Sequence, residues 1–268
     1  GFKIDELFKY SNSGLQTKND SLTIHFSQIG VENVLYDLKT LNSLELRQKY
    51  NIQKDGRDWT IDLAKKDITE SKGVFFEIQY KPFDFRKSYY TGNSKGFIAY
   101  PRKELTDHIL KEDNLALATM RQIAGTKQTC IVMLTKAVMT DRAMYSTNGT
   151  PYLFPLYLYQ NQQLQVDKSS LNTFAYRIPN LNAEIIEKIS KNIALTFIDE
   201  KEDIHGTFAP IDLLDYIYAV LHSPKYRETY KEFLKIDFPR VPYPKDAKTF
   251  LELGKLGAVR YSPMSRPN

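Results

Sequence analysis

A change of sequence pattern along the chain constrains the fold more than any other feature. Between residues 71 and 165, short aromatic and β-branched runs alternate with Gly, Asn, Pro and Thr, and such runs predict β-strands. The runs are GVFFEIQY, GFIAY, NLALATMRQ, TCIVMLTKAVM and YLFPLYLY. Helical spacing dominates before and after them. We therefore expect an α+β fold in which a bent, mostly antiparallel central sheet is flanked by N-terminal and C-terminal helices.

The N-terminal part predicts one short strand followed by helices. LTIHF (22–26) alternates as a half-buried strand does. VENVLYDLKTL (31–41) and SLELRQKY (43–50) have helical spacing, with Ser43 as a plausible cap of the second. We expect this part to be mostly helical.

Helical spacing returns after a polar connector at 160–180. Ile185, Ile186, Ile189 and Ile193 form the apolar side of one predicted helix. Pro210 opens a second helix, and Ser223-Pro224 supplies a cap and a first-turn proline for a third. The predicted segments are a mostly helical 1–70, a β-rich core 71–165 and a helical 166–268.

Composition and charge narrow the class of protein. The single cysteine, Cys130, has no internal disulfide partner and lies in an apolar run, which suits a reduced thiol in the cytoplasm. The sequence shows no apolar run of about 18 residues and no secretory signal, so no membrane partner is expected. Residues 81–150 hold 11 Lys and Arg against 6 Asp and Glu, whereas the remainder is neutral. This segment could face a polyanion, although a solvated face is an alternative.

No catalytic or metal site emerges from the motifs. The histidines are isolated, and the sequence shows no Gly-rich phosphate loop, GxSxG elbow or Asn-Pro-Pro-Tyr-type motif. Asp237, Asp246 and Lys248 approximate a metal-dependent nuclease pattern, but Asp246 is also explained as a helix cap. We predict a binding module that has no catalytic centre of its own, with the nuclease as an alternative.

Two groups of residues have the side chains that DNA contacts require. In YKPFDFRKSYYTGNSKGFIAYPRK (80–103), cations offer phosphate contacts and a tyrosine pair offers stacking. This first group is Arg86, Lys87, Tyr89, Tyr90, Lys95, Arg102 and Lys103. A hairpin with a solvated basic tip, cross-strand tyrosine packing and an Arg86–Asp84 pair is the structural alternative.

The second group lies on or between the later strands. Arg and Lys read guanine, whereas Gln and Asn read adenine. The group is Arg121, Gln122, Lys127, Gln128, Lys136, Arg142, Ser146 and Asn148. Each of these is also an ordinary surface residue.

Several blocks in order resemble the C-terminal specificity region of Type ISP restriction-modification enzymes. They are LQTKNDSLTIHF, YKPFDFRKSYYTGNSKGFIAYPR, NLALATMRQ, FPLYLY, PNLNAEII and DLLDYIYAVLHSPKYRETYKEFLKIDFPRVPYPKD. The resemblance implies a module that recognises double-stranded DNA and positions a target adenine for the methyltransferase domain of the same chain. It also implies that the helical segment 1–70 joins this module to the methyltransferase part. It implies S-adenosylmethionine, ATP and magnesium for the parent enzyme and no cofactor for this part. The unfamiliar stretch between NLALATMRQ and FPLYLY is the expected base reader.

A third interpretation is a protein-interaction scaffold. Aromatic residues near the C-terminus have spacings compatible with one apolar helix face that docks on the methyltransferase domain. They are Tyr216, Tyr218, Tyr226, Tyr230 and Phe233. Core packing explains the same spacing, and docking is compatible with DNA recognition.

Overall fold

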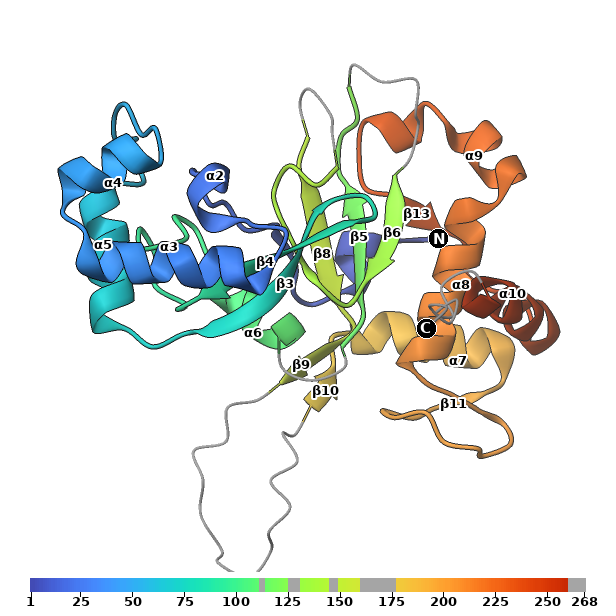
Figure 1. The fold of residues 1–268 in the computed structure, drawn as a ribbon. Coiled ribbons are helices and arrows are strands. Elements are labelled where there is room, and N and C mark those ends of the chain that lie inside the picture. The colour runs from blue at the N-terminus through green and yellow to red at the C-terminus, as the bar shows by residue number, and fades with distance from the viewer. Residues whose placement is uncertain (111–113, 125–130, 145–148, 160–176, 260–268) are drawn as a thin grey trace, which may run out of the picture. The chain divides into compact units, whose positions relative to one another are not determined.

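The computed structural model describes the chain except residues 111–113, 125–130, 145–148, 160–176 and 260–268. The chain folds as two compact units. The hairpin unit comprises 12–110 and 137–145, and the core-sheet unit comprises 1–11, 111–136 and 146–268. The predicted β-rich stretch 71–165 thus contributes strands to both units (Figure 1).

Helices make up the first half of the hairpin unit. They are α2 (Asp20–Thr23), α3 (Gln28–Thr40), α4 (Ser43–Lys49), α5 (Ile61–Glu70) and, after the hairpin, α6 (Lys103–Leu110). Side chains cap the N-termini, as Ser27 does for α3 and Thr60 for α5. The predicted helices at 31–41 and 43–50 are confirmed, although Asn42 rather than Ser43 caps α4, because its Oδ1 accepts from the amides of Leu44 and Glu45.

The predicted strand at 22–26 is wrong. The Asn19 side chain accepts from the Leu22 amide and starts the one-turn helix α2 over the first part of this run. His25 alone forms an isolated antiparallel bridge, with Lys87. A local cap therefore overrides the alternating pattern.

The sheet of the hairpin unit has the order β4-β3-β7. Its strands are β3 (Val74–Lys81), β4 (Asp84–Tyr90) and β7 (Val138–Met139), and the short β2 (Asn12–Ser13) precedes α2. β3 and β4 form an antiparallel hairpin, and β7 runs parallel to β3. The register places Phe75 opposite Tyr89 and Glu77 opposite Lys87.

The predicted strand GFIAY (96–100) forms no regular strand. The Phe97 amide donates to Asp67 Oδ2 at 2.8 Å, and its carbonyl accepts from Trp59 Nε1 at 3.2 Å. Side chains therefore satisfy backbone groups that a neighbouring strand would otherwise satisfy, and Phe97 is fully buried.

The core-sheet unit is centred on antiparallel strands in the order β8-β5-β6, which lie side by side in Figure 1. These are β5 (Ala116–Met120), β6 (Val132–Thr135) and β8 (Pro151–Pro155). Two-stranded pairings add β1 (Phe2–Lys3) with β13 (Arg240–Val241), β9 (Tyr157–Tyr159) with β10 (Arg177–Pro179), and β11 (Thr196–Phe197) with β12 (Thr207–Phe208). The α+β class is confirmed, but the strands belong to several small sheets rather than one central sheet.

The helices of the core-sheet unit bury their apolar sides against these strands and against one another. They are α1 (Ile4–Leu7), α7 (Ala183–Ile193), α8 (Pro210–His222), α9 (Pro224–Tyr230), the 3₁₀ helix η1 (Phe233–Lys235) and α10 (Ala247–Val259). The predicted helix openings at Pro210 and Pro224 are confirmed, and Ser223 Oγ accepts from the Tyr226 amide. Helices α8 and α10 pack closely, since a Cβ on Gly257 would lie 2.0 Å from the Asp215 carbonyl oxygen.

Asp215 is a buried carboxylate in this helix contact. Its Oδ1 has no hydrogen-bond partner within the described part of the chain. Burial raises its pKa to about 7; nearby Asp212 adds to the rise, whereas Lys201 opposes it. The folded state therefore binds a proton more tightly than the unfolded chain, whose aspartate pKa is near 3.8. The free energy of unfolding must then fall as pH rises from about 4 to about 7.

We expect Asp215→Asn to stabilise the protein at pH 8 by about 1–3 kcal/mol, because the amide is neutral at every pH. The gain should shrink as pH falls towards 4. Urea unfolding from pH 4 to pH 8 measures it, with the exposed Asp203→Asn as the control that leaves the profile unchanged. An equal gain in stability at pH 4 and pH 8 would contradict the raised pKa of Asp215.

Candidate nucleic-acid interface

Asp67 organises the loop that follows β4. This buried residue of α5 accepts hydrogen bonds from Thr91 Oγ1, Asn93 Nδ2 and the Phe97 amide, each at 2.8 Å. Gly96 must be glycine here, since a Cβ would lie 2.2 Å from Asp67 Oδ2. The carboxylate therefore fixes residues 91–97, which carry Lys95 at the surface.

Arg102 and Lys103 lie at the start of α6, after this loop. The Arg102 carbonyl accepts from the amides of Leu105 and Thr106, so this residue begins the helix. Its Nε atom is buried and has no hydrogen-bond partner among the residues the structure describes. A hollow of about 210 Å³ opens here, lined by Asn12, Ser94, Tyr100, Arg102, Lys103 and Glu104.

Lys95 and Lys103 are the free cations of this region. Both are exposed, and within the described ranges no carboxylate oxygen lies within 4.0 Å of either ammonium group. An unpaired surface lysine can approach a phosphate without first breaking an ion pair. These two residues, with Arg102, fit the predicted phosphate contacts best.

The two cations of strand β4, Arg86 and Lys87, already have partners in the protein. Arg86 makes a bidentate pair with Asp84, and its guanidinium lies 4.3 Å from the Phe26 ring centroid and 4.2 Å from that of Tyr80. Lys87 pairs with Glu77 at 2.9 Å. The structural alternative for Arg86 is therefore what the structure shows.

The tyrosine pair packs in the way the structural alternative describes. Tyr89 stacks edge-on against Phe75 at 5.1 Å and its hydroxyl accepts from the Gly73 amide. Tyr90 is 8% exposed and donates to Asp107 Oδ1 at 2.7 Å. The predicted DNA contacts of Arg86, Lys87, Tyr89 and Tyr90 stay predictions, and each would have to coexist with these bonds.

The second group of predicted residues falls on both units. Arg121 and Gln122 follow β5 and line a hollow of about 260 Å³ with Gly149, Thr150 and Tyr152. Arg121 also lies 3.4 Å from Asp237, at an exposed ion pair. Lys136 is exposed in the core-sheet unit, whereas Arg142 is exposed in the hairpin unit. Lys127, Gln128, Ser146 and Asn148 lie outside the described residues.

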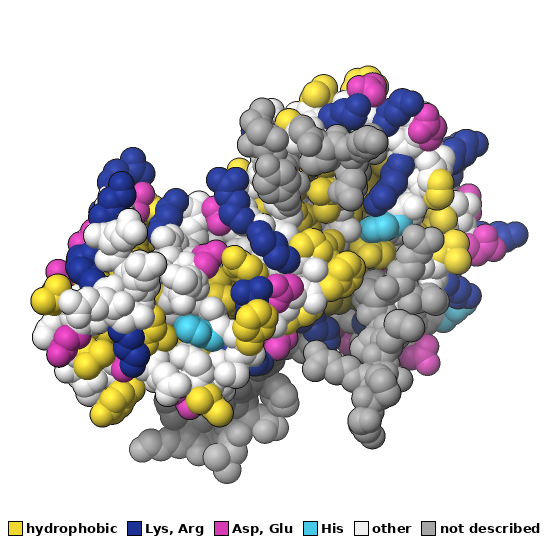
Figure 2. Space-filling view, turned by 45° about the horizontal axis from the view of Figure 1, so that its top comes forward, with side chains coloured by type: hydrophobic (Ala, Val, Ile, Leu, Met, Phe, Trp, Pro, Cys, Tyr) yellow, Lys and Arg dark blue, Asp and Glu magenta, His cyan; other side chains and the backbone are white. Residues whose placement is uncertain are grey.

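The described surface has cations spread over many elements. Figure 2 shows Lys and Arg side chains across the face in view, with Asp and Glu side chains among them. Because no patch of one charge stands out on this face (Figure 2), we choose the candidate phosphate contacts by the exposure and ion pairing of each cation. Lys18, which sequence reasoning did not select, is a further exposed cation, and its ammonium lies 5.8 Å from the Tyr100 ring. Its position in a polar loop was the signal available.

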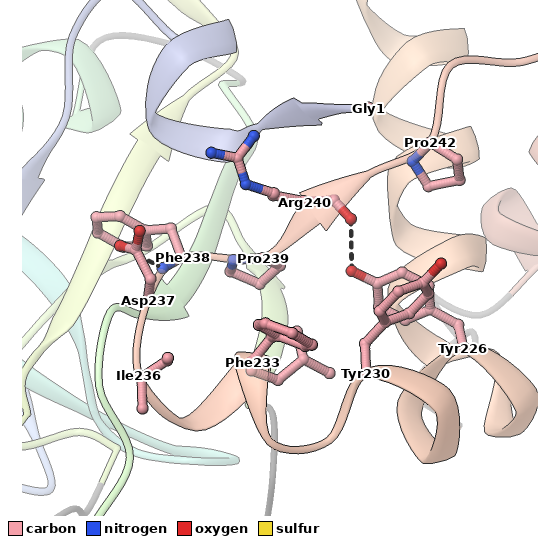
Figure 3. A pocket seen from close by; sticks show the side chains of 11 residues that line it. Gly1, Tyr226, Tyr230, Phe233, Ile236, Asp237, Phe238, Pro239, Arg240 and Pro242 are labelled. Atoms are coloured by element: carbon pink, nitrogen blue, oxygen red, sulfur yellow. Dashed lines mark hydrogen bonds between the residues drawn. The ribbon is translucent and has the colours of Figure 1, made fainter.

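The aromatic residues near the C-terminus divide between core and surface. Tyr216 and Tyr226 are buried, whereas Phe233 is 70% exposed. An apolar hollow of about 480 Å³ lies between η1 and β13, and Figure 3 shows the Phe233 ring below Pro239 and the Tyr226 hydroxyl bonded to the Arg240 carbonyl. Core packing accounts for the buried pair, and docking of a neighbouring domain stays a prediction.

The acidic residues of the nuclease alternative have structural roles. Asp237 pairs with Lys3 at 3.0 Å, and Asp246 caps α10 by accepting from the Thr249 amide at 2.7 Å. Within the described ranges, no three His, Cys, Asp or Glu side chains converge as a metal site requires. Nor is any described helix long and apolar enough to cross a membrane.

Comparison with known proteins identifies the family. Residues 6–259 match the family described as the Type ISP C-terminal specificity domain, and the chain belongs to this family. No curated protein sequence matches it significantly.

Three solved structures share the fold at low sequence identity. The first is a DrdV–DNA complex, with 19% identity and a TM-score of 0.65; the match covers 97% of this chain and 24% of that one. The second is the ATP-dependent Type ISP restriction-modification enzyme LlaBIII bound to DNA, with 19% identity, a TM-score of 0.64 and coverage of 98% of this chain and 16% of that one. The third is a nuclease-deletion mutant of the Type ISP restriction-modification enzyme LlaGI in complex with a DNA substrate mimic, with 18% identity, a TM-score of 0.60 and coverage of 99% of this chain and 23% of that one. The chain spans about a quarter or less of each of those chains.

Proposed function

We propose that this chain is a double-stranded DNA target-recognition module of a Type ISP restriction-modification enzyme. Membership of the specificity-domain family over residues 6–259 carries the proposal. The three solved relatives were all captured with DNA or a DNA mimic, and their folds cover nearly all of this chain.

The geometry supports phosphate contact by the start of α6 and the loop before it. Lys95 and Lys103 are exposed without carboxylate partners in the described structure, and the Asp67 bonds hold the loop in one conformation. Preorganised cations bind a polyanion at a lower entropic cost than mobile ones. Arg121 and Gln122 remain candidates for base contacts in the core-sheet unit.

In the parent enzyme, the module would place a target adenine before the methyltransferase domain of the same chain. The nuclease, ATPase and methyltransferase chemistry, with S-adenosylmethionine, ATP and magnesium, would belong to the other domains. The structural roles of Asp237 and Asp246 support a purely recognitive role for this part.

Titration of the chain against random duplex at about 50 and 200 mM salt tests DNA binding. We expect Lys95→Ala and Lys103→Ala each to weaken binding roughly fivefold for every sequence, and to reduce the salt slope by about one. Lys191→Ala, which removes an exposed lysine paired with Glu187 on α7, is the matched control. Absence of binding by the unaltered chain at 50 mM salt would refute the proposal.

A further inference from the structure

A polar hollow of the hairpin unit has no assigned role. Its volume is about 390 Å³, and it lies between the loop before α2 and the turn after β7. Gln16, Thr17, Lys18, Asp20, Thr140, Asp141 and Arg142 line it. The lining combines two carboxylates with two cations, and Asp141 was not among the residues expected to contact DNA.

Backbone hydrogen bonds hold Asp141 in place on both sides. Its amide donates to the Leu15 carbonyl at 2.9 Å, and the amide of Thr140 donates to the Gln79 carbonyl of β3 at 3.2 Å. Gly14 permits this close approach, because a Cβ there would lie 2.6 Å from the Met139 carbonyl oxygen. The Asp141 side chain therefore projects from a rigid platform, as a residue that reads a ligand must.

The two carboxylates of the hollow differ in their hydrogen bonding. Asp20 accepts from the Thr17 hydroxyl and interacts with the Tyr80 hydroxyl. The Asp141 side chain is only 16% exposed, yet within the described structure it receives no hydrogen bond, and Arg142 Nε lies 4.0 Å away. Burial raises the pKa of Asp141, against the effect of Arg142 and Lys18. An acceptor that is partly buried and receives no donor from the described part of the protein is available to a donor of a ligand or of solvent.

The surroundings indicate which donor fits. Lys18 and Arg142 bring positive charge to the hollow, whereas a carboxylate repels phosphate and adds nothing to non-specific DNA affinity. In the major groove, the cytosine N4 amino group is the donor that Asp and Glu read. Adenine presents its N7 acceptor beside the N6 amino group, which a carboxylate disfavours and a side-chain amide suits.

We propose that Asp141 is a specificity-determining residue whose carboxylate accepts a hydrogen bond from the N4 amino group of a cytosine in the bound duplex. The inference rests on the proposed function and deepens it. Asp141 discriminates at one G·C pair, and Lys18 and Arg142 contact the flanking phosphates.

Selection from a random duplex library, followed by titration, tests this assignment. We expect the unaltered chain to require cytosine at one position, and Asp141→Asn and Asp141→Ala to lose roughly five- to a hundredfold of discrimination there. Affinity of both variants for random duplex should stay equal or rise, because a negative charge is removed. Replacing the cytosine by pyrimidin-2-one, which lacks the amino group, should weaken the unaltered chain by a similar factor and leave Asp141→Ala unaffected.

Glu70→Gln, which removes an exposed carboxylate of the same unit, is the control that keeps the full preference. Circular dichroism establishes that each variant is folded. Three results would overturn the proposed role of Asp141: the Asp141 variants keep the preference for cytosine, they lose affinity equally for all sequences, or they lose discrimination at an A·T pair. The proposed role also falls if the amino-free base is tolerated. In these cases the unaltered chain still binds DNA and the proposed function stands, whereas no binding by the unaltered chain overturns both.

Discussion

Replacing Asp67 by alanine is expected to lower the free energy of unfolding by about 3 kcal/mol. The substitution leaves three donors without their acceptor: the Thr91 hydroxyl, the Asn93 side-chain amide and the Phe97 backbone amide. The Phe97 amide is buried, and a buried donor that loses its partner costs about 1–3 kcal/mol. Urea unfolding followed by circular dichroism measures the change.

Two further variants separate this role from a general effect of removing charge. Glu70→Ala removes an exposed carboxylate from the same helix and should change the free energy of unfolding by less than about 0.5 kcal/mol. For Asp67→Asn, the loss of unfolding free energy should lie between those of Asp67→Ala and Glu70→Ala. The asparagine keeps one acceptor oxygen, but its NH₂ group faces a hydrogen-bond donor in place of the second oxygen. A loss below about 1 kcal/mol for Asp67→Ala would show that the loop bonds contribute little.

The same variant should also weaken DNA binding under conditions where it remains folded. Asp67 holds residues 91–97, and this segment carries Lys95. Loss of the three bonds releases the loop, so the lysine must be ordered again when it meets a phosphate. The weakening should be similar for all sequences, in contrast to the effect expected at Asp141.

Replacing Phe154 by alanine is expected to lower the free energy of unfolding by about 3–5 kcal/mol. This fully buried residue of β8 contacts the rings of Phe8 and Phe238, with centroid separations of 5.3 and 5.5 Å. Truncation removes apolar contact and leaves a cavity beside the Phe8 and Phe238 rings that close packing cannot fill without strain. Urea unfolding followed by tyrosine fluorescence measures the loss.

Leucine at position 154 preserves most of the buried volume and should cost about half as much or less. Phe85→Ala, at an exposed position of β4, should cost less than about 1 kcal/mol. Equal losses for the buried and exposed phenylalanines would contradict the assigned core. Phe154 and Asp67 belong to different units, which can unfold in separate transitions. The unfolding of each variant should therefore be followed by several probes, which show whether one or two transitions occur.

Helices with local signals were predictable from sequence. The isoleucine spacing of 183–193 and the prolines at 210 and 224 correspond to α7, α8 and α9. Capping and apolar periodicity depend on residues within one or two turns, so sequence alone contains the information. The two predicted strands that are absent, at 22–26 and 96–100, lie where side chains bind backbone groups: Asn19 caps α2, and Asp67 accepts from the Phe97 amide.

The candidate site was only partly predictable for the same reason. The basic and aromatic character of 80–103 was visible in the sequence, but which cations are free was not. Arg86 and Lys95 are both cations of this segment, yet one is held by Asp84 between two rings and the other has no carboxylate within 4.0 Å in the described structure. The Arg86–Asp84 pair, between residues two apart, was visible in the sequence as an alternative, whereas the distance from Lys95 to any carboxylate is set by folding.

By itself, the sequence determined the α+β class, most helices, the relation to the specificity-domain family and the segment rich in possible DNA contacts, because local periodicity and ordered sequence blocks record these properties. Only the tertiary structure decided which charged groups are neutralised and which are left unpaired. Asp141 and Asp20 are both acidic residues near polar neighbours in the sequence, yet folding gives one its hydrogen-bond donors and leaves the other without a donor in the described structure. Thr17 lies only three residues from Asp20, whereas the long-range backbone contact between Asp141 and Leu15, which no local pattern encodes, places the Asp141 side chain.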